Sequence, residues 1–370
     1  MLGGMDGGPA ERTLRAALEA CALDSAEAAL ASGAVGRALL LADRAPSLAV
    51  PAGVEVEVDA PASDGAFVFG ERLAEAVRRH RITRLVYAGA GSAPLLGEAE
   101  WRALAAGPGA RGPARCVTNN RFSADLFALR PASVLAALDP APRTDNAVPR
   151  RLAESHGVAV SELPRTVETQ FNLDTPNDLV TLALAVRGGP RLRRALKQAR
   201  LDTSRLSEAS RVFVDRTKQV LVAGRVTSRT WQYLETEAAC RVRVLSEERG
   251  MQSAGTDADG TARSLLGQWI AAAGPERAFT EMLPELCDAA FIDLRPALVQ
   301  LGIRASRVDR FAADLGLASA VEDPALRRIV AAAAASPVPV VLGGHSLVGG
   351  CLHLLNQWAW DEHDRLAGRR

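Results

Sequence analysis

The chain has 370 residues, of which 48% are apolar, and its 44 basic and 43 acidic residues give a net charge of +1. A chain of this length suggests two domains, each able to bury its own core. The balanced charge excludes a bulk preference for nucleic acid or an anionic membrane, and Pro or Gly interrupts every apolar run before it reaches the length of a membrane span. We therefore expect a soluble, cytoplasmic protein.

Strand and helix patterns alternate through the first half of the chain. Helical spacing covers residues 13–31, "GRALLLADRA" is typical of a buried strand, and "GVEVEVD" alternates as a short strand. "FGERLAEAVRRHRI" predicts a helix, and "RLVYAGAGSAPLL" predicts a strand that enters a Gly-rich turn. "RCVTNN" predicts a further strand and "RPASVLAALDPA" a helix. This alternation predicts a mostly parallel sheet with helices on both faces.

In the second half, strand and helix patterns alternate again after a polar connection rich in arginine. "KQVLVAG", "CRVRVLS", "DAAFIDL" and "PVPVVLGG" predict four strands, and helical patterns separate them. We expect a first α/β domain over residues 1–195, a linker over 196–206, and a second, parallel α/β domain over 207–370.

The segment "FNLDTPNDL" joins a strand end to a helix start. Asp174 or Thr175 can cap the helix, Pro176 suits its first turn, and Asp178 favours the positive end of the helix dipole. These preferences explain the local structure without any enzyme.

Together with "YAGAGSAPLL", this segment resembles the nucleotidyltransferase superfamily, in particular the molybdenum cofactor guanylyltransferase and phospholactate guanylyltransferase groups. The resemblance covers roughly residues 14–185 and implies a GT-A-type, three-layer α/β/α fold of the nucleotide-diphospho-sugar transferase kind. It also implies Mg²⁺ held by a carboxylate. Pro94 and Leu95 match the family's G-D-x-P-L turn, whereas Ser92, after Gly91, stands where the metal-binding Asp belongs. With Ser92 at that position, Asp125 or Asp174 is left to hold the cation, and we take both as metal-binding and catalytic candidates.

The same family has a Gly-rich, basic loop after its first strand. The first residues offer such a loop through Gly3, Gly4, Gly7, Gly8 and Arg12, and backbone N–H groups in it are able to hold a phosphate. The strand expected before it is missing, because only two residues precede Gly3. Two interpretations stay open: a start further upstream, or a flexible terminus.

The stretch "VTNNRFSADLFAL" follows a predicted strand, at the position where the resemblance implies acceptor-side residues. We take Gly91, Ser92, Asn119 and Asn120 as candidate substrate or phosphate ligands and Asp125 as a catalytic or metal-binding candidate. A hydrogen-bonded loop capped by Ser123 and Asp125 explains the same residues equally well.

Polar residues also follow each strand of the second half, where parallel α/β sheets bind their ligands. The candidates for binding a phosphate or carboxylate are Arg225, Ser228, Arg229, Arg249, Asp293, Arg295 and Ser346. Glu248 and His345 are the candidates for acid–base catalysis. The alternative is a Ser or Thr helix cap with arginines that face solvent. "GGHSLVGG" departs from the G-x-S-x-G elbow of serine hydrolases at Val348.

Three functions follow from these patterns. The first is a nucleotidyltransferase-like enzyme that uses Mg²⁺ and acts on a nucleotide or a phosphorylated small molecule. The second is a catalytically silent binding or scaffold protein that keeps the fold. The third is an enzyme whose chemistry lies in the second domain and whose substrate is phosphorylated or anionic. We expect no nucleic acid or membrane partner, and a homodimer stays open.

Overall fold

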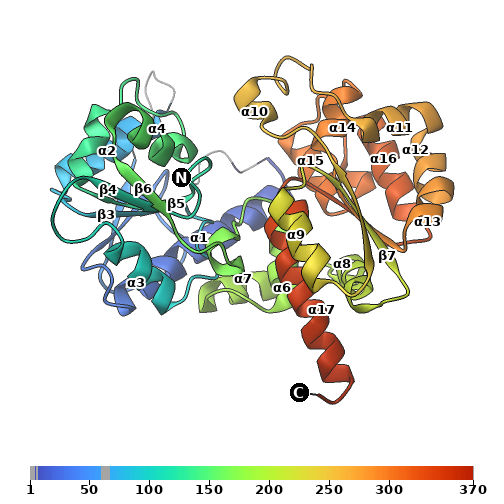
Figure 1. The fold of residues 1–370 in the computed structure, drawn as a ribbon, viewed down its shortest axis with the longest axis horizontal. Helices are drawn as coiled ribbons and strands as arrows, with labels where there is room; N and C mark the ends of the chain where they lie inside the picture. The colour runs from blue at the N-terminus through green and yellow to red at the C-terminus, as the bar shows by residue number, and fades with distance from the viewer. Residues whose placement is uncertain (1–4, 6, 60–66, 370) are drawn as a thin grey trace. The chain divides into compact units, whose positions relative to one another are not determined.

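A computed structural model describes residues 5, 7–59 and 67–369, apart from the side chains of Gln252 and Ser253. The chain is a mixed α/β protein with parallel and mixed sheets, which confirms the predicted class (Figure 1). It divides into two units that are each internally packed. The first contains residues 15–173 and 187–195, and the second contains residues 5–14, 174–186 and 196 onward. The second unit therefore includes residues 174–186, which the sequence analysis assigned to the first domain.

The first unit contains two separate sheets, β1-β2 and β3-β5-β4-β6. Its strands are β1 (Ala38–Ala42), β2 (Val54–Val58), β3 (Leu85–Ala88), β4 (Arg115–Thr118), β5 (Leu126–Arg130) and β6 (Ala159–Glu162). Its helices are most of α1 (Pro9–Ala31), α2 (Phe69–Arg79), α3 (Glu98–Ala106), η1 (Ala132–Ala137), η2 (Asp145–Ala147), α4 (Val148–His156), α5 (Val167–Gln170) and the first part of α7 (Pro190–Ala199).

Helices cover both faces of the four-stranded sheet. On one face, Phe127 and Leu129 pack with Leu73 of α2 and with α4 and η1. On the other face, Leu126 packs with Trp101 of α3 and with the end of α1. The first unit therefore has three layers, with its sheet in the middle.

One expectation for the first unit is wrong. The sheet is mixed rather than mostly parallel, because β5 pairs antiparallel to both β3 and β4. "LFALR" is this strand, which the sequence patterns did not predict, because it is buried along both faces and lacks the polar alternation that marks a strand. The helix predicted in "RPASVLAALDPA" is present as a 3-10 helix over residues 132–137.

The second unit has one sheet in the order β10-β9-β7-β8, and all of its strands are parallel, as expected. The strands are β7 (Gln219–Gly224), β8 (Arg241–Ser246), β9 (Ala289–Asp293) and β10 (Val340–Gly343). The helices are α6 (Pro176–Ala185), α8 (Ser204–Arg211), η3 (Val212–Val214), α9 (Ser228–Glu237), α10 (Met251–Ala254), α11 (Leu265–Ala273), α12 (Pro275–Arg277), η4 (Ala278–Met282), α13 (Leu283–Leu286), α14 (Arg295–Gln300), α15 (Arg307–Asp314), η5 (Ala318–Ala320), α16 (Pro324–Ala335), η6 (Leu347–Cys351) and α17 (Leu352–Leu366).

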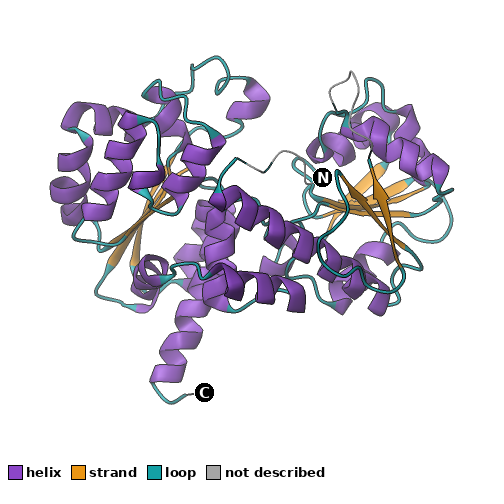
Figure 2. Cartoon of the chain, turned by 180° about the vertical axis from the view of Figure 1, so that it is seen from behind, coloured by secondary structure: helices purple, strands orange, loops and turns teal. Residues whose placement is uncertain are grey.

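This sheet is also sandwiched between helices, which Figure 2 shows from behind. Leu221 and Ile292 pack on one face against α11 to α16. On the other face, Phe291 stacks on Phe213 with ring centroids 5.3 Å apart. Asp or Ser side chains accept a backbone N–H at the starts of α11, α15 and α16, which fixes where these helices begin. Within the described residues, no helix combines the length and apolarity needed to cross a membrane.

Candidate functional site

The strand order of the second unit creates a topological switch point. From β7 the chain proceeds to β8 on one side of the sheet and to β9 and β10 on the other. Connections leave the carboxyl ends of β7 and β9 in opposite directions, and this is the place where open parallel sheets bind ligands.

Gly224 allows the ends of β7 and β9 to approach each other closely. Its φ is +118°, and a Cβ atom at this position would lie 2.4 Å from the Cβ of Asp293. No side chain fits at residue 224, so the two strand ends meet through backbone and the Asp293 carboxylate.

Arg225 and Asp293, both predicted as site residues, are joined directly. The Arg225 Nε lies 2.6 Å and its Nη2 3.1 Å from the two carboxylate oxygens of Asp293. Asp293 is fully buried, and the side chain of Arg225 is about a fifth exposed. These two hydrogen bonds to Asp293 fix the position of the Arg225 guanidinium beside the switch point.

A second pair lies next to the first. Arg295, the third of the predicted residues, donates from Nη2 to both oxygens of Asp314 at 2.8 and 2.7 Å. Burial raises the pKa of Asp314 to about 6, and the charge of Arg295 opposes that rise. The Nη1 atom of Arg295 is buried without a hydrogen bond. The pKa of the nearby Arg310 is lowered by burial and by the charge of Arg295.

His345 lies two residues after the end of β10 and within electrostatic range of the first pair. Surrounding protein lowers the pKa of its imidazole, although the residue keeps an exposed face, and Arg225 lowers the pKa further. Asp293 raises the pKa and Arg249 lowers it. The ring is therefore mostly neutral at pH 7 and is able to accept a proton.

The first turn of α9 is exposed beside Arg225. Thr227 caps the helix by accepting the N–H of Thr230 at 3.0 Å, while Ser228 and Arg229 lie exposed at its first two positions. An exposed helix start of this kind presents N–H donors and the positive end of the dipole.

The residues after β8 mainly hold a loop in place. The carboxylate of Glu247 accepts from Ser264 and from the N–H of Leu266, at the start of α11. Glu248 accepts from the Thr256 hydroxyl at 2.5 Å. Both carboxylates are thus engaged by the chain, whereas Arg249 is exposed.

The two most distinctive segments of the sequence meet inside the second unit. The hydroxyls of Thr175 and Ser346 lie 3.1 Å apart. The buried carboxylate of Asp178 accepts from the N–H groups of Asp174 and Thr175 and, through its other oxygen, from Cys351 at 3.1 Å. "LDTPNDL" therefore packs against "HSLVGGC", and Asp178 rather than Asp174 organises the start of α6.

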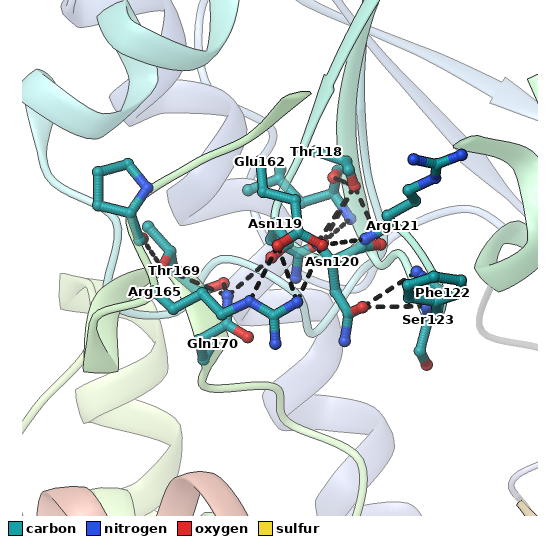
Figure 3. Close-up of polar contacts among 12 residues, drawn as sticks. Thr118, Asn119, Asn120, Arg121, Phe122, Ser123, Glu162, Arg165, Thr169 and Gln170 are labelled. Carbon is teal, nitrogen blue, oxygen red and sulfur yellow. Dashed lines mark hydrogen bonds and ion pairs between the residues drawn. The ribbon is translucent and has the colours of Figure 1, made fainter. Parts of the chain in front are cut away.

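In the first unit, Asn119 and Asn120 hold their own loop (Figure 3). The side-chain oxygen of Asn119 accepts the N–H groups of Asp125 and Leu126 at 3.3 Å. The side-chain oxygen of Asn120 accepts the N–H groups of Phe122 at 3.1 Å and Ser123 at 3.3 Å. The loop is hydrogen-bonded, but the side chains of Asn119 and Asn120 cap it rather than those of Ser123 and Asp125.

Asp125 shares its surroundings with a second carboxylate near the end of β3. Burial raises the pKa of Asp125 to about 7, and the charge of Asp145 raises it too. Asp145 accepts the hydroxyl of Tyr87 at 2.8 Å, and Gly89 donates its N–H to the carbonyl of Asp125. Two carboxylates suit Mg²⁺ only when water or substrate phosphates supply its remaining ligands.

The other predicted ligands of the first unit have structural contacts. Ser92 is buried and donates its hydroxyl to the carbonyl of Gly89 at 2.9 Å. A Cβ atom at Gly91 would lie 2.3 Å from the carbonyl oxygen of Leu173, so this glycine permits a close backbone approach. Among the described residues, no group of three or more His, Cys, Asp or Glu side chains is placed to hold a metal ion.

The N-terminal glycines are only partly described. Gly3 and Gly4 lie outside the described residues. Gly7 donates to the carboxylate of Glu11 at 2.8 Å, and Gly8 accepts from Arg12 within the first turn of α1. Gly7 and Gly8 thus belong to a helix start in the second unit, and a phosphate-binding loop in this part of the chain stays a prediction.

Sequence reasoning missed Asp145, Asp314 and Cys351 as neighbours of the candidate residues. Asp314 ends a helix whose buried face includes Phe311, so an acidic residue on an apolar face was an available signal. Asp145 lies in a polar stretch that carries no such signal. No family model, no curated protein and no solved structure matches this chain.

Proposed function

We propose that the second unit binds a phosphorylated or otherwise anionic small molecule at the carboxyl ends of β7, β9 and β10. The observation that carries the proposal is the Arg225–Asp293 pair at the switch point, beside the exposed first turn of α9. Arg225 uses Nε and Nη2 for Asp293, and its Nη1 makes no hydrogen bond within the described residues. A positioned guanidinium donor next to a helix start suits phosphate or carboxylate oxygens.

The neighbouring residues support a reaction at the same place. The imidazole of His345 is mostly neutral at pH 7 and lies within electrostatic range of Arg225. A neutral imidazole beside an anionic group is suited to general base catalysis. Arg249 and Arg229 add exposed positive charge near His345 and at the start of α9. The proposed roles are anion binding for the arginines and proton transfer for His345.

The first test is thermal shift of the intact protein against inorganic phosphate, pyrophosphate and nucleoside mono- and triphosphates, each with and without Mg²⁺. A ligand that binds the native state raises its apparent stability. We expect a phosphorylated compound to raise the Tm. We expect Arg249→Gln to weaken its affinity by about ten-fold or more, because a hydrogen bond to a charged group contributes about 1.5–3 kcal/mol and each 1.4 kcal/mol is about ten-fold.

Arg216→Gln is the matched control. Arg216 is exposed and precedes β7, so it lies at the opposite, amino end of the same strand. The control removes the same charge from the chain, and we expect it to leave the affinity unchanged. Equal weakening in both variants would mean that net charge alone attracts the ligand, and no shift with any compound would remove the proposal.

A second candidate is the nucleotidyltransferase-like activity that the resemblance implies for the first unit, with a GT-A-type fold. The pairing of Asp125 with Asp145 supports it, because two acidic groups whose charges repel bind a cation readily. This candidate requires triphosphate binding that depends on Mg²⁺ and that Asp125→Asn weakens. If neither unit binds a phosphorylated compound, the silent scaffold is the better hypothesis.

A further inference from the structure

The sheet region of the first unit is interrupted between β1 and β3. Strand β1 pairs only with β2, and β3 pairs only with β5, among the residues that the structure describes. Each strand therefore has one edge whose backbone N–H and C=O groups have no strand partner in that part of the chain. Such edges are templates for an additional strand.

A cavity of about 610 Å³ is lined by both of these strands. Residues 37–41 contribute from β1 and its start, and residues 85–88 contribute from β3. Leu73 of α2 lines the cavity and belongs to the core on one face of the four-stranded sheet. Trp101 of α3 also lines it and belongs to the core on the other face. The cavity thus continues the middle layer of the unit, between two layers of helix.

The sequences of both strands are those of central strands. "ALLLA" of β1 and "LVYA" of β3 are apolar at consecutive positions, so they present apolar side chains to both faces. Their side chains are nevertheless only half-buried at most positions. Exposed edge strands of soluble proteins usually carry charges, Pro or a bulge, and neither strand has a charged residue or Pro within its bounds.

We propose that this cavity is a binding slot for an extended apolar segment of a partner polypeptide, which inserts as a strand between β1 and β3. Main-chain hydrogen bonds to the two edges would supply the register, as in strand addition to an open sheet edge. The slot matches an apolar run of four or five residues, the lengths of β3 and β1. This inference concerns the first unit and does not depend on the anion site of the second.

Charge defines one flank of the segment. Arg37, Arg81 and Arg84 are exposed and line the cavity near the starts of β1 and β3. Arg37 has Glu55 as its partner, whereas Arg81 makes no side-chain ion pair within the described residues. An Asp or Glu next to the apolar run complements this basic rim, and a basic flank is disfavoured.

The test is hydrogen exchange of the intact protein with and without a synthetic peptide whose Val/Ile/Leu core of five residues follows two acidic residues. We expect the amides of β1 and β3 to exchange at least ten-fold more slowly with saturating peptide. A peptide with Pro at alternate core positions has the same flank but lacks the N–H donors of a strand, and we expect it to give no protection.

Two variants separate the slot from non-specific apolar binding. Ala26 is half-buried on α1 and lines the cavity, so Ala26→Trp fills the space and is expected to abolish protection. Ala31→Trp places the same ring at an exposed position of the same helix and is expected to leave protection intact. The comparison of the two peptides on the unmodified protein remains decisive if Ala26→Trp does not fold.

Three outcomes would overturn the proposal. The first is no protection at saturation, and the second is equal protection by both peptides. The third is that a short-chain alkane protects the amides of β1 and β3 as strongly as the strand peptide does. That result would identify the cavity as a site for small apolar ligands. A fourth result would contradict a separate partner polypeptide. In it, the free peptide gives no protection of β1 and β3, and the same peptide protects them only when a flexible linker joins it covalently to the chain.

Discussion

The guanidinium of Arg225 holds the carboxylate of Asp293 through two hydrogen bonds, 2.6 and 3.1 Å long, at the point where β7 and β9 end side by side. Asp293 also accepts the backbone N–H of Arg295 at 3.1 Å. One buried carboxylate therefore fixes the first residues of two strand–helix connections. The geometry of the proposed anion site depends on this contact.

Removal of the Arg225 side chain is expected to destabilise the protein strongly. Arg225→Ala leaves a buried, unpaired carboxylate, and breaking such a pair costs about 3–5 kcal/mol of unfolding free energy. Urea denaturation at pH 7.5 measures the loss, and Arg216→Ala at the exposed amino end of β7 is the control, with an expected effect below about 0.5 kcal/mol. Similar losses in the two variants would show that the pair is not important for stability.

The close approach at Gly224 predicts a second large effect. Gly224→Ala places a methyl group 2.4 Å from the Cβ of Asp293, so the strand ends must separate, and we expect a loss of about 3 kcal/mol or more. Gly302→Ala is the matched control, because Gly302 also has a positive φ, of +69°, but no atom lies within 4 Å of its added Cβ. The control should cost about 1–2 kcal/mol from the backbone conformation alone. Thermal or urea unfolding of both variants measures the two losses of unfolding free energy. Equal losses would contradict a steric role for Gly224.

Asp125 is expected to make stability fall as the pH rises. Burial raises its folded-state pKa to about 7, well above the ordinary value of an Asp carboxyl, so the native state binds its proton more tightly than the unfolded state does. The unfolding free energy therefore decreases with increasing pH between about 4 and 7. Above that range Asp125 is charged in the folded state, and the full destabilisation by its buried charge is present.

The variant Asp125→Asn tests this assignment. The amide cannot ionise, so the variant should lose this part of the pH dependence and gain stability relative to the unmodified protein at pH 8. Unfolding measured from pH 4 to pH 8 in both proteins provides the comparison. Parallel curves for the two proteins would place the titration elsewhere, and Asp314, with a pKa of about 6, is the next residue to examine.

Asp178 is predicted to be the most sensitive residue of "LDTPNDL". Asp178→Ala removes a fully buried carboxylate that accepts from two backbone N–H groups and from the Thr175 hydroxyl, and we expect a loss of about 3 kcal/mol. Asp202→Ala is the control, because Asp202 accepts the N–H of Ser204 at an exposed site, where the loss should be about 1 kcal/mol. Equal losses in urea denaturation would contradict this role for Asp178.

The sequence predicts the second unit well because its signals are local. Three strands of the second unit, β7, β9 and β10, are short apolar runs, and β8 alternates Arg and Val; each of the four ends in Gly, Asp or Ser, so its period and its termination are readable without tertiary information. The approach of Arg225 to Asp293 follows from the rule that ligand-binding residues gather at strand ends, and the structure brings the two together.

The sequence predicts the first unit less well because the decisive contacts are long-range. The pairing direction of β5 depends on which strands flank it, and nothing in "LFALR" encodes that choice. Similarly, Asp178 has the local features of a helix start, but its contact with Cys351 joins residues 173 positions apart. The assignment of α6 to the second unit rests on such contacts, and a reading of neighbouring residues does not reveal them.

The position of α6 has a consequence for how this chain is inherited and cut. Asn177 on α6 donates to the carbonyls of Asp314 and Leu342, and the first seven residues of α6 are buried. The chain enters the second unit, leaves it, returns for residues 174–186, leaves again and finally returns at residue 196. No single cut in the chain therefore separates two complete units. Recombination of the gene at one breakpoint would likewise leave at least one unit without a segment that it needs. The two halves of the sequence are therefore expected to be gained, lost and expressed together.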